Sequence, residues 1–151
     1  MQRRTFLTNL IGLTAVAAAS TLPARAATHG HHLKHVVYEL DEKDLNREIA
    51  VLRNVRNNLN ASGAKNMHLE VVIHGGGIHL LERALTDQSL QATIDTLKMD
   101  GVRFRVCHNT IVSNKLDYHK DLYDVQKKDI VPSGVAYLVD RQLQGWAYMH
   151  P

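Results

Sequence analysis

The chain has 151 residues, with 18 Lys and Arg, 15 Asp and Glu and a formal net charge of +3. Residues 1–26 hold three of the basic residues and none of the acidic ones, so the remainder is balanced in charge. Nucleic-acid binding needs clustered excess Lys and Arg, and we therefore expect no nucleic acid as a partner. The remaining length of about 125 residues fits one domain with one hydrophobic core.

The first 26 residues predict a removable export signal of the twin-arginine type. Arg3 and Arg4 precede an apolar stretch over 10–19, and the small residues Ala24 and Ala26 mark a cleavage site. This stretch is too short for a membrane span, which takes roughly 20 residues. A general secretory signal is the alternative. We expect a periplasmic protein that has no membrane association once the signal is removed.

Residues 27–34 form a polar, His-rich segment that we expect to be mobile, ahead of a single domain over 35–151. In this segment His29, His31 and His32 could share a metal ion through their imidazole nitrogens. Cleavage at the end of the signal would also place a free amine two residues before His29, a donor set that suits Cu²⁺ or Ni²⁺ in a square plane. A solvated tail without a metal role is the simpler alternative. We predict no cofactor.

The first half of the domain alternates strands and helices. The apolar run 35–40 predicts a buried strand, and Asp41 offers an N-cap for an amphipathic helix that ends at Gly63. A β-branched run over 69–74 predicts a second strand, which stops at three consecutive glycines. A short helix over 78–85 follows.

The second half continues this alternation. A helix is expected from Asp87 to Gly101, followed by a strand over 102–106. Residues 114–129 lack a clear period and predict a loop, with one short helix inside it as an alternative. A brief strand, a helix and a last strand over 146–149 then close the chain. Strands joined by helices need crossover connections. The fold class is therefore α/β, a three-layer α/β/α sandwich with a mostly parallel sheet of about five strands.

Two turns at the carboxyl ends of neighbouring predicted strands hold the candidate site. Ligands of open α/β sheets bind at this edge, so we expect a substrate or ligand to lie between the turns. His74 or His108 would place a cation or a proton acceptor beside the thiol of Cys107. The residues of the two turns are His74, Gly75, Gly76, Gly77, Cys107, His108, Asn109 and Thr110.

Cys107 is the single cysteine of the chain, so no disulfide can form within it. Backbone N–H groups of the following turn, or of a helix beginning near Thr110, would favour its thiolate and make it the candidate catalytic residue. A buried, inert thiol is the alternative. The glycine turn likewise has two interpretations, a tight turn that needs positive φ or a loop that binds an anion or admits a substrate.

Three segments together resemble the DsrE/DsrF-like family of small sulfur-relay proteins, in particular its exported single-domain members. They are the His-Gly-Gly-Gly turn (74–77), the Gly-Val-x-Phe-x-Val-Cys-x-Asn-Thr segment (101–110) and the closing segment from Val-Pro-Ser-Gly-Val to Gly-Trp-Ala-Tyr-x-x-Pro (131–151). The resemblance covers most of 35–151. It implies a three-layer α/β sandwich that assembles into homo-oligomers, often trimers or hexamers.

The resemblance also implies a cysteine that accepts and passes sulfane sulfur as a persulfide. Cys107 stands at that position, with Asn109 and Thr110 shaping its turn. The leading hypothesis is a periplasmic, sulfurtransferase-like sulfur carrier that exchanges sulfur with donor and acceptor thiols. A non-catalytic oligomeric module that binds a small ligand is the main alternative, and a Cu- or Ni-binding protein using the His-rich segment is a third.

Overall fold

The computed structural model describes residues 33–151, which contain one sheet in which every pair of neighbouring strands is parallel. The strand order across this five-stranded sheet is β4-β3-β2-β1-β5, which confirms the predicted mostly parallel sheet. The strands are β1 (Lys34–Leu40), β2 (Met67–Ile73), β3 (Arg103–Cys107), β4 (Ile130–Val131) and β5 (Ala147–Met149).

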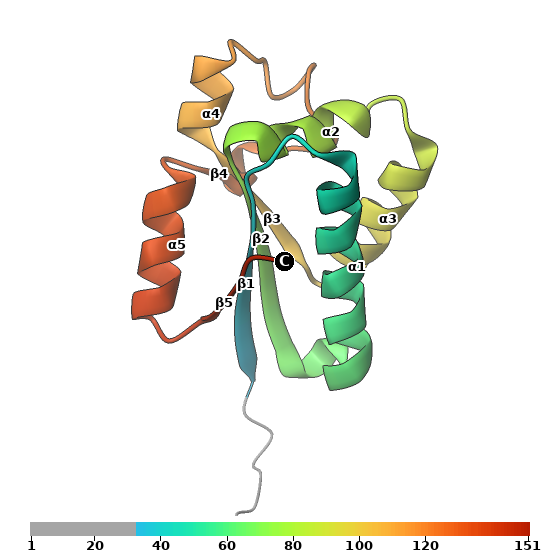
Figure 1. Cartoon of the computed structure of the whole chain (residues 1–151), viewed down its shortest axis with the longest axis vertical. Helices are drawn as coiled ribbons and strands as arrows, with labels where there is room; N and C mark the ends of the chain where they lie inside the picture. The colour runs from blue at the N-terminus through green and yellow to red at the C-terminus, as the bar shows by residue number, and fades with distance from the viewer. Residues whose placement is uncertain (1–32) are drawn as a thin grey trace, which may run out of the picture.

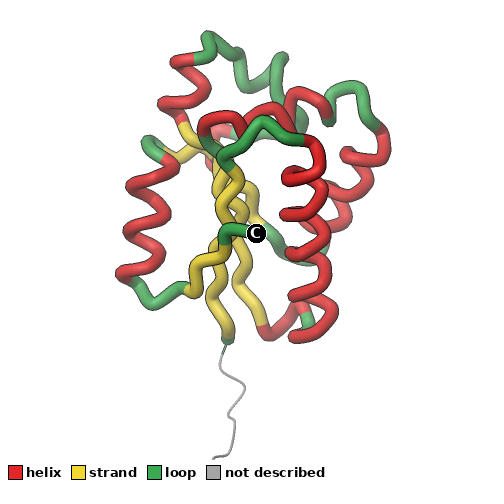
Figure 2. Tube along the Cα trace, viewed as in Figure 1, coloured by secondary structure: helices red, strands yellow, loops and turns green. Residues whose placement is uncertain are grey.

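Helices cover both faces of the sheet, which confirms the three-layer α/β/α sandwich. Figure 1 shows α1 and α3 on one side of the strands and α5 on the other, with α2 and α4 near one end of the sheet. The tube in Figure 2 shows the same three layers. The helices are α1 (Leu45–Ser62), α2 (His79–Arg83), α3 (Gln88–Met99), α4 (His108–Ser113) and α5 (Gly134–Leu143). Short 3₁₀ turns lie at Ala64–Asn66, Gly75–Ile78 and Lys127–Asp129.

Helix α1 begins later than its sequence predicts. Its N-cap is Asp44, whose carboxylate accepts a hydrogen bond of 2.8 Å from the amide of Arg47. The predicted N-cap, Asp41, instead lies in the loop that follows β1, where its backbone packs against the glycine turn. The predicted end is confirmed, since Gly63 caps the helix with a φ of +79°.

The two faces of the sheet have cores of different size. Strand residues such as Val36, Tyr38 and Leu40 join the large core beneath α1 and α3. Residues on the opposite face, including Val37 and Val72, form a much smaller cluster with Leu138 of α5. Tyr137 and Trp146 pack against that cluster. The α5 face therefore has room for polar side chains.

Within the predicted loop 114–129, residues 114–126 contain no helix or strand, and a short 3₁₀ helix at Lys127–Asp129 follows them. Leu122 and Val125 are nevertheless buried in the large core, and the amide of Tyr123 donates a hydrogen bond of 3.1 Å to the carbonyl of Leu81. These contacts hold the segment against the domain. Among the described helices, none is both long and apolar enough to cross a membrane.

Candidate functional site

Cys107 is the last residue of β3 and the N-cap of α4, on the face of the sheet that α5 covers. The helix that follows it begins at His108, two residues earlier than its sequence predicts. His74 and Cys107 directly follow Ile73 and Val106, which are partners in the register of β2 and β3. Because side chains alternate along a strand, His74 and Cys107 share one face at the carboxyl edge of the sheet.

Cys107 is only 5% exposed, yet its sulfur has polar donors nearby. Burial raises the pKa of the Cys107 thiol, but hydrogen bonds from the Thr110 hydroxyl and from the amides of Gly134, Thr110 and Asn109 outweigh it. The net result is a pKa below the ordinary value of 9.0. Donors from the first turns of both α4 and α5 thus favour the thiolate.

Thr110 links the two predicted turns. Its hydroxyl oxygen accepts a hydrogen bond of 2.9 Å from the amide of Gly75 while its hydroxyl bonds to the Cys107 sulfur. The Thr110 residue itself is only 7% exposed. Thr110 is therefore both an acceptor for the glycine turn and a cause of the lowered pKa of the Cys107 thiol.

The three glycines after β2 pack against the loop that connects β1 to α1. Gly75 has a φ of +52°, which favours glycine. A Cβ on Gly76 would lie 2.5 Å from the amide nitrogen of Lys43, and one on Gly77 would lie 2.1 Å from the carbonyl oxygen of Leu40. Backbone-to-backbone approach requires glycine at these two positions. The amide of Gly75 donates to Thr110, which lies in the turn that follows Cys107.

His74 pairs with a carboxylate rather than with the thiol. Its Nε2 lies 2.6 Å from Oε1 of Glu39, whose other oxygen accepts a hydrogen bond from the hydroxyl of Tyr148. The ring of His74 also packs against Gly134, where a Cβ would lie 2.9 Å from the Cβ of His74. Glycine at the start of α5 therefore allows that helix to approach both His74 and Cys107.

The remaining predicted residues take different positions. His108 is exposed and lines a 380 Å³ cavity together with Tyr118 and Lys127. Asn109 is also exposed and contributes its backbone amide to the sulfur. The candidate metal ligands His29, His31 and His32 lie outside the described residues.

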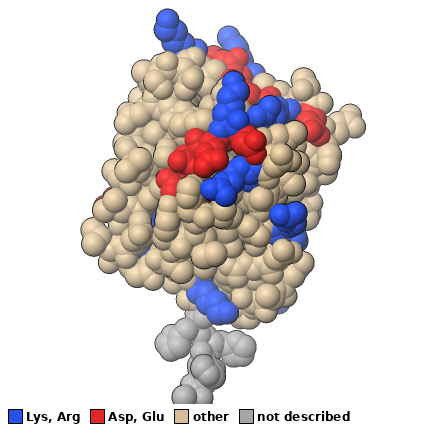
Figure 3. Space-filling model, in the orientation of Figure 1, with Lys and Arg blue, Asp and Glu red and all other residues tan. Residues whose placement is uncertain are grey.

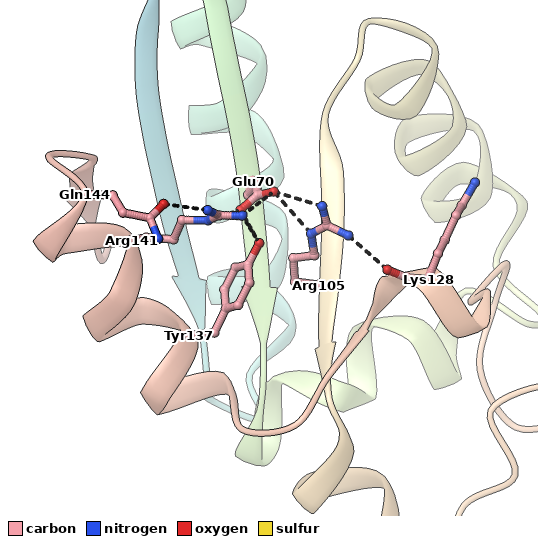
Figure 4. Close-up of polar contacts among 6 residues, drawn as sticks. All are labelled: Glu70, Arg105, Lys128, Tyr137, Arg141 and Gln144. Atoms are coloured by element: carbon pink, nitrogen blue, oxygen red, sulfur yellow. Dashed lines mark hydrogen bonds and ion pairs between the residues drawn. The ribbon is translucent and has the colours of Figure 1, made fainter.

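A buried polar network that the sequence interpretation missed holds α5 on the sheet. Figure 4 shows Glu70 of β2 between Arg105 of β3 and two side chains of α5, Tyr137 and Arg141. Glu70 is 1% exposed and accepts hydrogen bonds of 2.8 Å from both Tyr137 and Arg141 and of 3.0 Å from Arg105. Burial raises the pKa of Glu70, but these three partners outweigh it and lower the pKa.

A sequence signal for this network exists. Glu70 is the one acidic residue within the predicted strand 69–74, and both of its chain neighbours are buried. A carboxylate inside such a strand needs a buried cation or hydrogen-bond donors, which Arg105 and Arg141 supply. Through this network, β2 and β3 determine where α5, and hence the amide of Gly134, lies relative to the Cys107 sulfur.

Charged side chains gather in one part of the molecular face drawn in Figure 3, where Asp and Glu lie directly beside Lys and Arg. Most of that face carries no charge. Residues 27–151 as a whole are balanced in charge.

Comparisons with known proteins agree with the fold and with the sequence segments around Cys107. A model of the DsrE/DsrF-like family matches residues 52–151. Among solved structures, the chain is similar to MTH1491, a protein of unknown function from Methanobacterium thermoautotrophicum, with 35% sequence identity and a TM-score of 0.67. That match covers 78% of this chain and 99% of the other. No curated protein matches the sequence.

Proposed function

Because the chain belongs to the DsrE/DsrF-like family, which is associated with sulfur relay, we propose that it carries sulfane sulfur as a persulfide on Cys107. The observation that supports this most directly is the set of hydrogen-bond donors around the Cys107 sulfur, which lowers its pKa despite burial. A thiolate is the form of cysteine that attacks sulfur, and an inert buried thiol has no need of such donors.

The proposed transfer is an exchange at sulfur. The Cys107 thiolate attacks the outer sulfur of a donor persulfide, R–S–SH, so that a new S–S bond forms while the donor's S–S bond breaks and R–S⁻ leaves. An acceptor thiolate then attacks the outer sulfur of the Cys107 persulfide in the same way. This second step returns Cys107 to the thiolate. The sulfur is passed on without any external oxidant or reductant.

The surroundings of Cys107 suit both steps. In the first step the donors of α4 and α5 maintain the attacking thiolate. In the second step Cys107 is the leaving group, and a leaving thiolate of low pKa departs faster. The hydroxyl of Thr110 and the amide of Gly134 thus stabilise negative charge on the Cys107 sulfur both when it attacks and when it leaves.

Mass spectrometry of the intact protein tests this proposal. After incubation with a low-molecular-weight persulfide, the wild-type chain is expected to gain the mass of one sulfur atom, and a thiol acceptor should remove it. Cys107→Ser is the matched control, because it removes the only thiol of the chain. A wild-type protein that gains no sulfur would overturn the proposal and favour the alternative of a small-ligand-binding module.

We also propose that the protein acts in the periplasm, after removal of residues 1–26, as a homo-oligomer. Three apolar side chains of α5, Val135, Val139 and Leu143, are 58%, 49% and 82% exposed. Their spacing of four residues puts them on one side of the helix. A second copy of the chain would cover this apolar stripe, which is costly to leave in water.

A further inference from the structure

We propose that Glu39, Asp41 and His74 form a binding site for a divalent transition-metal cation, for which Zn²⁺ is the best fit. The three residues come from the carboxyl ends of two neighbouring strands, since Glu39 lies in β1, Asp41 follows β1 and His74 follows β2. One ligand atom from each lies within 4.8 Å of the others. This site goes beyond the sulfur chemistry proposed for Cys107 and does not include the thiol, although His74 also belongs to the glycine turn of the candidate site.

One imidazole nitrogen and two carboxylate oxygens together suit a metal ion of borderline hardness. Zn²⁺ accepts imidazole nitrogen and carboxylate oxygen at about 2.0–2.2 Å, and its ligand atoms then lie roughly 3–4 Å apart. Small rotations of the three side chains would bring the observed positions to that spacing. Two carboxylates also balance the charge of a divalent ion. Three protein ligands leave a further coordination position for water or a substrate.

The charges around the site supply a second, independent argument. The two fully buried carboxylates among the described residues both have arginine partners: Glu48 pairs with Arg83 and Glu70 with Arg105. Within residues 33–151, by contrast, neither Glu39 nor Asp41 forms an ion pair with Lys or Arg. The side chain of Glu39 is only 14% exposed. The partners of Glu39 are the imidazole of His74 and the hydroxyl of Tyr148, and neither is a permanent cation. A bound metal ion would compensate the charge of this carboxylate.

The C-terminal segment provides the outer contacts that metal ligands commonly have. The hydroxyl of Tyr148 in β5 bonds to one oxygen of Glu39, and Nε2 of His150 lies 3.1 Å from Oδ1 of Asp41. Such contacts fix the orientation of ligating carboxylates. The last residues of the chain would thus hold both acidic ligands in place.

This site uses none of the residues of the His-rich segment that the sequence also offers for metal binding. β1 begins at Lys34, and Glu39 lies near its other end. At about 3.3 Å per residue, roughly 16 Å of strand separates them. Replacing His29, His31 and His32 by Ala therefore gives a background in which metal binding at the proposed site can be measured alone.

The test uses the full chain in that background, freed of metal with a chelator and titrated with Co²⁺ and Zn²⁺. We expect one Co²⁺ per chain, visible absorption bands of a bound ion, and displacement of Co²⁺ by Zn²⁺. Asp41→Asn and His74→Gln should each weaken binding at least about 10- to 100-fold, the loss that even outer contacts produce. The matched controls Asp140→Asn and His119→Ala, at exposed positions, should bind as the background does.

Cys107→Ser separates this inference from the proposed function. It is expected to abolish sulfur uptake and to leave Co²⁺ affinity unchanged. Absence of Co²⁺ binding in the folded background protein, or equal affinity in Asp41→Asn and His74→Gln, would overturn the metal site. A Co²⁺ spectrum with a thiolate charge-transfer band that disappears in Cys107→Ser would overturn it as well, since the thiol would then be a ligand.

Discussion

The amide of Gly75 donates a hydrogen bond of 2.9 Å to the hydroxyl oxygen of Thr110, and so joins the turn after β2 to the first turn of α4. The same hydroxyl bonds to the sulfur of Cys107. A single threonine therefore connects the glycine turn to the thiol. This contact explains how the glycine turn, which lies more than thirty residues away in the chain, can influence the sulfur of Cys107.

Thr110→Val removes the hydroxyl while keeping the shape of the side chain. The Cys107 thiol then loses its largest stabilising hydrogen bond, and its pKa is expected to rise toward the ordinary value of 9.0. The pH dependence of alkylation by iodoacetamide measures this directly, because only the thiolate reacts. Thr110→Ser retains a hydroxyl and serves as the control. An unchanged alkylation profile in Thr110→Val would show that the hydroxyl does not act on the sulfur.

Gly77→Ala is expected to destabilise the fold. Its Cβ would lie 2.1 Å from the carbonyl oxygen of Leu40, so the loop between β1 and α1 must shift. Overpacking of this kind typically costs about 1–3 kcal/mol, and a contact with backbone favours the upper end. Urea unfolding measures the change, with Ala136→Ser at an exposed site as the control. A variant as stable as wild type would contradict the packing role of this glycine.

Glu70→Gln leaves Arg105 and Arg141 without their buried carboxylate. Loss of one partner of a buried ion pair costs about 3–5 kcal/mol. Because the pKa of Glu70 is lowered in the folded protein, the wild type keeps this stabilisation above the ordinary value of 4.5 and loses it as the pH falls through the lower folded value. Unfolding free energies of wild type and Glu70→Gln should therefore converge in acid.

The control for this pH dependence is Asp140→Asn, an exposed position on the same helix. It should follow the wild type at every pH. A difference between wild type and Glu70→Gln that stays constant from neutral pH to well below 4.5 would show that the charge of Glu70 is not what holds α5.

Replacing both Arg3 and Arg4 by Lys tests the predicted export signal. In a bacterial host with a twin-arginine pathway, the wild type should reach the periplasm and lose about the first 26 residues, which intact mass reports. The double variant should stay in the cytoplasm with its signal attached. Export of the double variant at the wild-type level would instead point to the general secretory route.

Much of the fold follows from local patterns. The β-branched run before the three glycines predicts β2, and Gly63 predicts the end of α1, because these signals depend only on neighbouring residues. The N-cap of α1 is the position at which the prediction from sequence was wrong. Asp41 and Asp44 are both good caps by composition, and packing of Asp41 against Gly76 leaves Asp44 to begin the helix.

By itself the sequence determined the order of strands and helices, the single thiol and its place at the end of β3, since hydrophobic periodicity and turn residues act over short distances. Tertiary structure alone decided that the amide of Gly134 reaches the Cys107 sulfur and that Glu39 meets His74. Those contacts join residues that lie 27 and 35 positions apart in the chain. No local pattern specifies them, because they depend on which strands become neighbours and on how α5 lies across the sheet.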